Sequence, residues 1–236
     1  MLLSKPAITP MVWPTELEAP LRLKCQTSKG GAVLLLSTAV FFIGVLLVLV
    51  AVPDIVRHTG WVLLLLLLLV AFWVSFIKLS DPLDVLELNQ DGVQFFHRRG
   101  SWQIDWKNLD VVLLPSLPDG IEFAYLGFRI REYQPLMATM PLRLQVQLLK
   151  EQRHLMVQAS AASCQTGACA SDYLMMIGPC QHQGVEYRGV QGMFVSRMLN
   201  LRQFLSADLF VPQQSLPCSL VEACQQINRY RLRYQN

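Results

Sequence analysis

The sequence predicts an α+β protein in which a two-helix transmembrane hairpin is followed by an antiparallel sheet domain with inserted helices and a C-terminal helix. The hairpin is predicted by two stretches without a charged residue, Ala32–Val52 and Trp61–Ile77. At about 1.5 Å per residue, the first can cross a hydrocarbon core of roughly 30 Å, and the second only just can. After Pro82, apolar residues recur first at every second position and later at helical spacing, which predicts the α+β domain.

This pattern divides the chain into three segments. They are an N-terminal arm at residues 1–30, the transmembrane hairpin at 31–78 with helices at 32–52 and 61–77, and the sheet domain at 79–236. The first apolar stretch is longer than the core of a signal peptide, so we expect a retained anchor. In the arm, Leu17, Leu21 and Leu23 are apolar enough to lie on a membrane surface, and a loosely ordered tail is the alternative.

Basic residues flank the two apolar stretches at their outer ends. Lys5, Arg22, Lys24 and Lys29 precede the first stretch, and Lys78, Arg98 and Arg99 follow the second. The connecting loop holds only Arg57, with Asp54 against it. Because cytoplasmic loops carry an excess of Lys and Arg, we expect a multi-pass membrane protein with both termini in the cytoplasm.

Cysteine spacing and net charge agree with this placement. The six cysteines show no disulfide framework, and a cytoplasmic domain would keep them reduced. The net charge of +3 gives no indication of a nucleic-acid partner, so the lipid bilayer is the partner that we expect first.

Alternating residues and turn signals predict four or five strands in an antiparallel meander. The predicted strands are 85–88, 93–96, 102–106, 109–114 and 121–131. Asn89–Gly92, Arg98–Ser101 and Pro118–Gly120 are the expected turns. Trp102, Ile104 and Trp106 should share one buried face.

Helical spacing dominates the second half of the domain. A helix should begin at Pro141 and continue to about Gln158, and the small and polar residues 160–170 should form a flexible loop. The expected later elements are a helix at 190–205, a short strand at 209–212, and a last helix at 220–233 that Ser219 caps.

Short motifs in this order resemble membrane-tethered bacterial pleckstrin-homology-like proteins. These motifs are Leu86-x-Leu88 before Asp91-Gly92-Val93, Ile104-x-Trp106-x-x-Leu109, and Leu209–Pro212 before a helix with Glu222 near its start. Gly127–Arg131, Leu148–Arg153 and Asp208–Pro212 further resemble an uncharacterised family of gammaproteobacterial two-span inner-membrane proteins. The resemblance implies a pleckstrin-like cytoplasmic domain that carries additional helices, and it implies no catalytic residue.

Groups with chemical potential are few. Cys164, Cys169, Cys180 and His182 are the only cluster of soft ligands, but the first spacing is too wide for a structural zinc site. There is no phosphate loop, nucleophile elbow or His-Glu-x-x-His motif. Glu151 and His154 alone support neither acid–base work nor a metal, and Asp105 and Asp110 are expected to be solvated. We therefore expect no catalytic residue, no metal and no cofactor.

Arginines are the remaining candidate contacts. The candidates for contact with anionic lipid head groups or another membrane protein are Arg98, Arg99, Arg129, Arg131, Arg229 and Arg233. Near an anionic membrane surface each contributes roughly 1 kcal/mol to binding, whereas ordinary solvated arginines are the alternative reading.

The function expected from the sequence is a non-catalytic, membrane-anchored binding or scaffolding module. Two alternatives stay open. An accessory subunit of a transport or envelope-assembly complex would need polar residues in the spans, and only Ser37, Thr38 and Ser75 occur there. A membrane-bound enzyme with an unrecognised site would need convergent carboxylates, histidines or cysteines.

Overall fold

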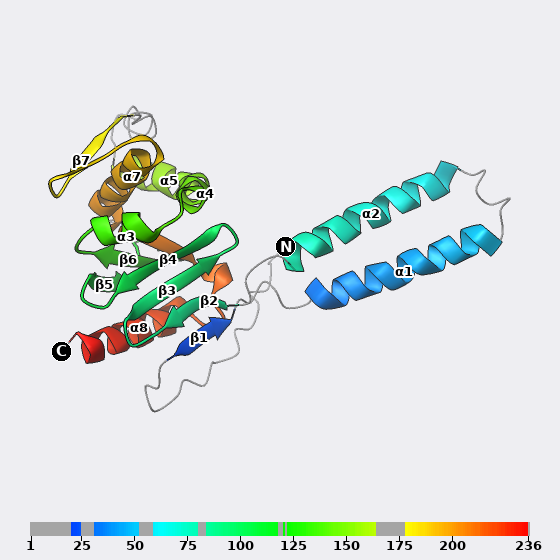
Figure 1. The fold of residues 1–236 in the computed structure, drawn as a ribbon, viewed down its shortest axis with the longest axis horizontal. Coiled ribbons are helices and arrows are strands. Elements are labelled where there is room, and N and C mark those ends of the chain that lie inside the picture. Colours follow the sequence, from blue (N-terminus) through cyan, green and yellow to red (C-terminus); the bar gives the residue numbers. More distant parts are fainter. Residues whose placement is uncertain are drawn as a thin grey trace. The chain divides into compact units, whose positions relative to one another are not determined.

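The computed structural model places the chain in two compact units (Figure 1). It describes residues 20–24, 31–51, 59–79, 84–117, 120, 122–163 and 178–235. One unit comprises Cys25–Leu83, and we call it the helical unit; the other, the α+β unit, joins Met1–Lys24 to Asp84–Asn236. Three features of the sequence analysis lie outside the described residues: Leu17 with its predicted membrane contact, the loop with Arg57, and the cysteines Cys164 and Cys169.

The helical unit contains two helices of 21 residues each, α1 (Gly31–Ala51) and α2 (Thr59–Leu79). They pack against each other, with Val45 and Leu68 buried, so the two predicted helices are confirmed as helices. Most of their other large apolar side chains are exposed. Counted over the described residues alone, no helix of the structure is long and apolar enough to cross a membrane.

The first sheet of the α+β unit has the order β1-β2-β3-β4, with every pair antiparallel. Its strands are β1 (Leu21–Lys24), β2 (Asp84–Leu88), β3 (Gly92–His97) and β4 (Gly100–Asp105). The sequence predicts the last three but not β1. Leu23 is 0% exposed and pairs with Leu86, so the expectation that Leu21 and Leu23 lie on a membrane surface or in a loose tail is wrong.

A second antiparallel sheet has the order β5-β6-β9. Its strands are β5 (Leu109–Leu113), β6 (Tyr125–Ile130) and β9 (Leu209–Pro212). A single meander is therefore the wrong prediction, because β4 and β5 belong to different sheets. Trp106 lies at the junction, buried and stacked on Tyr230, and its indole N–H donates to the Asn89 carbonyl at 2.9 Å.

Helices and one small hairpin fill the chain between β6 and β9. They are α3 (Gln134–Thr139), α4 (Leu142–Glu151), α5 (Arg153–Ser163), β7 (Cys180–His182), β8 (Val185–Tyr187) and α7 (Gly189–Leu205). The helix predicted from Pro141 is interrupted at Gln152, whose buried side chain donates to the Phe210 carbonyl at 3.3 Å. Residues 160–163 continue α5, so the flexible loop predicted there is wrong at its start.

The C-terminal helix α8 (Leu220–Tyr234) follows a short 3-10 turn, η2 (Gln213–Ser215). Ser219 accepts from the Glu222 N–H, and the Glu222 carboxylate accepts from Ser219, so the predicted cap is confirmed as a capping box. Figure 1 shows α8 on one side of the strands, and α3, α4, α5 and α7 on the other. The α+β unit is thus layered, with strands between two helical covers.

Asn228 of α8 completes the open edge of β5. Its amide oxygen accepts from the Val112 N–H at 3.3 Å, and its amide nitrogen donates to the Val112 carbonyl at 2.7 Å. The side chain thereby satisfies the backbone N–H and C=O of one residue of the edge strand, as a neighbouring strand would.

We expect Asn228→Ala to lower the free energy of unfolding by about 1–3 kcal/mol, because it leaves partly buried backbone groups of Val112 without this partner. Urea unfolding of the full chain measures the effect. Gln225→Ala, an exposed change on the same helix, should stay within about 0.5 kcal/mol of the wild type. Equal losses in the two variants would contradict the role of Asn228.

Candidate functional site

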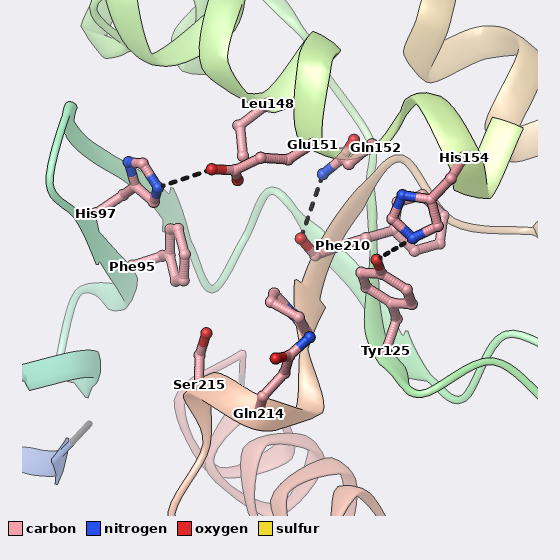
Figure 2. Close-up of a pocket in the computed structure, with 11 residues that line it drawn as sticks. Phe95, His97, Tyr125, Leu148, Glu151, Gln152, His154, Phe210, Gln214 and Ser215 are labelled. Atoms are coloured by element: carbon pink, nitrogen blue, oxygen red, sulfur yellow. Dashed lines mark hydrogen bonds and ion pairs between the residues drawn. The ribbon is translucent and has the colours of Figure 1, made fainter. Parts of the chain in front are cut away.

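A cavity of about 340 Å³ lies in the α+β unit, among β3, β6, β9, η2 and the junction of α4 with α5 (Figure 2). This volume is at the lower end of what small-ligand sites enclose. The first sheet provides one wall, the second sheet the opposite wall, and the helix junction lies above both. Sequence elements far apart in the chain therefore meet at this pocket.

One side of the pocket carries a paired histidine and carboxylate. The Nε2 atom of His97 lies 3.3 Å from Oε1 of Glu151, and Gln147 donates to the same oxygen at 2.8 Å. The Nδ1 atom of His97 accepts the Arg99 backbone N–H at 3.1 Å, so its hydrogen must sit on Nε2 and point at Glu151. The hydrogen bond from His97 lowers the pKa of Glu151, and the bond from Gln147 acts in the same direction.

The opposite side of the pocket carries a tyrosine and a second histidine. The Tyr125 hydroxyl lies 2.8 Å from Nε2 of His154, and the ring of Phe210 meets Tyr125 edge-on at 6.4 Å. Burial, followed by the charge of Glu151, raises the pKa of Tyr125. This end of the pocket is thus polar, with a phenol that stays protonated.

Apolar side chains form most of the remaining wall. Phe95, Leu148 and Phe210 are buried beside the cavity, and Gln214 and Ser215 of η2 lie at its floor (Figure 2). The bond from Gln152 to the Phe210 carbonyl holds the helix junction over β9. The pocket therefore combines an apolar body with separate polar groups, as ligand sites do.

The lowered pKa of Glu151 makes the stability of the fold depend on pH in the acidic range. Because its folded pKa lies below its ordinary value, ionised Glu151 stabilises the fold above the unfolded pKa, and this contribution is lost as the pH falls through the folded pKa. We expect Glu151→Gln to lower the free energy of unfolding at about pH 6, and this difference from the wild type to shrink as the pH falls to about 3. Urea unfolding at both pH values tests this, with exposed Glu132→Gln as the control that should leave the profile unchanged.

Sequence reasoning noticed Glu151 and His154 but missed the pocket. The sequence around Glu151 and His154 does not show which residues they contact. Their partners, His97 and Tyr125, come from strands with no local motif. The histidines that the sequence leaves scattered are in part brought together, since His97 and His154 line the same cavity. His182 instead packs on Tyr133, with ring centroids 4.5 Å apart.

The predicted arginines lie away from this cavity and fall into two groups. Arg129 and Arg131 both pair with Asp110, at 2.6 and 3.8 Å, so Asp110 is ion-paired rather than only solvated. The other four are exposed and have no acidic partner within the described ranges: Arg98 and Arg99 in the β3–β4 turn, and Arg229 and Arg233 on α8.

Metal-ligating groups do not gather in the part of the chain that the structure describes, where no three of His, Cys, Asp and Glu could hold an ion. Cys180 and His182 lie on β7, and the Cys180 thiol has a pKa raised by burial. A raised thiol pKa disfavours the thiolate that metals bind.

Two antiparallel sheets, a helical layer between β6 and β9, and a capped last helix define an α+β domain whose first sheet receives a strand from before the helical unit. The chain belongs to the family DUF2982, described as a protein of unknown function, whose model matches residues 86–233. The match covers most of the α+β unit and none of the helical unit. No curated protein and no solved structure matches the chain.

Proposed function

We propose that this protein is a non-catalytic binding or scaffolding module anchored in the bacterial inner membrane by the helical unit. The two uncharged stretches of the sequence, Ala32–Val52 and Trp61–Ile77, support the anchor because they have the length that a membrane crossing needs. The exposed apolar side chains of α1 and α2 also support it, because contact with water would be costly over so large a surface.

The pairing of β1 with β2 carries the proposal. Lys24 and Asp84 are register partners on neighbouring antiparallel strands, so the helical unit leaves and re-enters the α+β unit at one place. A segment with both ends on one folded domain must begin and end on the same side of a membrane. Two crossings meet this condition and one does not, and the Lys and Arg residues that flank the two stretches support a cytoplasmic position for both termini.

Element order supports a pleckstrin-like α+β unit. A four-stranded antiparallel sheet is followed by a three-stranded one and by a C-terminal helix, with the extra helices inserted before β9. Domains of this kind present pockets and sheet edges to ligands, so the cavity of Figure 2 is the proposed binding site.

The unpaired arginines are the proposed contacts with anionic head groups or with another membrane protein. Arg98 and Arg99, and likewise Arg229 and Arg233, keep their charge available, whereas Asp110 already engages Arg129. Each arginine that reaches an anionic membrane surface would contribute roughly 1 kcal/mol to binding.

An enzyme is the second candidate, because the pocket joins His97 to Glu151. Nucleophilic catalysis needs a base bonded to a nucleophile. Among the described pocket residues, Ser215 makes no hydrogen bond to either histidine, so binding is the better-supported role.

Alkaline carbonate extraction of native membranes tests the anchor. We expect the protein to stay in the membrane pellet, and tags at both ends to be protected from a protease added outside the inner membrane. Release into the carbonate supernatant, or cleavage of either tag from the periplasmic side, would refute the proposed placement.

A further inference from the structure

The pocket of Figure 2 has one ionised group that is not neutralised by a cation. Among the described residues that line it, Glu151 is the only Asp or Glu, and none is a Lys or Arg. Lys150 and Arg153, its neighbours along the chain, are exposed and lie outside the lining. The cavity therefore presents net negative charge to a ligand.

One oxygen of Glu151 is free to accept a hydrogen bond. Gln147 and His97 both use Oε1, and Oε2 has no partner within the described residues. The side chain is 44% exposed, so a ligand in the cavity can reach this oxygen. The lowered pKa keeps the carboxylate charged at neutral pH.

The hydrogen bonds of His97 fix the orientation of its ring beside Glu151. Its Nδ1 atom accepts the Arg99 N–H, and a proton there would face that donor. The Nε2–H of His97 thus points at Glu151 and orients its carboxylate.

The rest of the cavity suits a short apolar stem. Phe95, Leu148 and Phe210 offer apolar surface beside Glu151, while the side chains of Gln214 and Ser215 make no hydrogen bond within the described residues. An alkyl chain can lie along these rings while its charged end meets Oε2.

From this geometry we infer that the pocket binds a cationic amine on an apolar stem, either a small alkylammonium or a lysine side chain of a partner. The inference rests on the proposed binding role and adds the chemical class of the ligand. A charge-assisted hydrogen bond to Oε2 provides the preference for a cation over neutral or anionic analogues.

Three probes of matched length test the inference on the full chain in detergent: butylammonium, butanol and butyrate. The imidazole NMR signals of His97 and His154, assigned from His97→Gln and His154→Gln, report occupancy of the cavity. We expect butylammonium to bind about tenfold more tightly than butanol, and butyrate to bind least. Glu151→Gln should abolish this preference, whereas Glu132→Gln should retain it.

Equal binding of the three probes, a preference for butyrate, or no binding at all would overturn the inference. The comparison among probes on the wild type decides the question even if Glu151→Gln fails to fold. Tighter binding of Nα-acetyl-lysine amide than of butylammonium would assign the ligand to a partner's side chain, and the reverse would assign it to a free amine. None of these results depends on carbonate extraction, so failure of the membrane anchor is distinguishable.

Discussion

A variant in which a turn of four residues replaces residues 25–83 is expected to leave the membrane and to keep the α+β unit folded. Lys24 and Asp84 are register partners, and hairpin loops of two to five residues are the ordinary length for joining antiparallel strands. Among the residues that the structure describes, the helical unit contributes no strand to the sheets of the α+β unit. Ultracentrifugation after cell lysis should find the variant in the supernatant, whereas the full chain should sediment with membranes.

The matched control begins at Asp84 and therefore lacks β1 as well as the helical unit. Leu23 is fully buried in the sheet, so its removal should lower the free energy of unfolding by about 1.5–3 kcal/mol relative to the four-residue-turn variant. Urea unfolding compares the two soluble chains. Equal stability would show that β1 adds nothing to the sheet.

Two outcomes would contradict the prediction for the four-residue-turn variant. Loss of folding would mean that the α+β unit needs the helical unit, against their separation into two compact bodies. Sedimentation with membranes would place membrane affinity in the α+β unit itself. In that case vesicles with and without anionic lipid, combined with Arg98→Gln and Arg99→Gln, would show whether the unpaired arginines supply it.

Local patterns in the sequence predict those helices and strands that are specified by residues close to them in the chain. Strands β2 to β4 follow from alternation and turn residues, and α8 follows from Ser219 and Glu222, which satisfy each other's backbone at the helix start. The buried face of Trp102, Ile104 and Trp106 is confirmed for the same reason. In these cases the residues that specify the element lie within a few positions of it.

The elements that sequence reasoning missed depend on partners far along the chain. Strand β1 forms because Leu23 pairs with Leu86, which follows the helical unit in the sequence. The helix break at Gln152 accompanies a hydrogen bond from its side chain to the Phe210 carbonyl. Neither contact leaves a periodic signal. A four-residue strand at the end of a proline-bearing arm has no turn signal beside it and is too short for an alternating pattern to predict it.

The pocket could not be predicted from the sequence for the same physical reason. His97 and Glu151 are each ordinary surface residues of a strand end and a helix end, and their bond forms only when two sheets and a helix junction meet. The arginine candidates are a related case, since a shared strand face does not reveal that Asp110 on the neighbouring strand pairs with Arg129. Charge patterns along a chain predict exposure better than they predict pairing.

Asp208 is the residue whose loss should destabilise the α+β unit most. It is 0% exposed just before β9, where its carboxylate accepts the Tyr133 hydroxyl at 2.5 Å and the Ile130 N–H at 2.8 Å. The Arg202 guanidinium lies 3.5 Å away and also donates to the Ile130 carbonyl. One carboxylate thus connects β6, α7 and the chain leading into β9.

We expect Asp208→Ala to lower the free energy of unfolding by about 3–5 kcal/mol, because it leaves two buried donors and a partly buried guanidinium without their acceptor. Asp110→Ala is the matched control, since Asp110 also pairs with an arginine but is 34% exposed; it should cost less than about 1 kcal/mol. Tyr133→Phe, which removes one donor and keeps the carboxylate, should fall between the two. Urea unfolding of the three variants measures this order. If Asp208→Ala cost no more than Asp110→Ala, the carboxylate would not be what joins these elements, and apolar packing around Leu209 and Phe210 would have to hold β9 in the sheet.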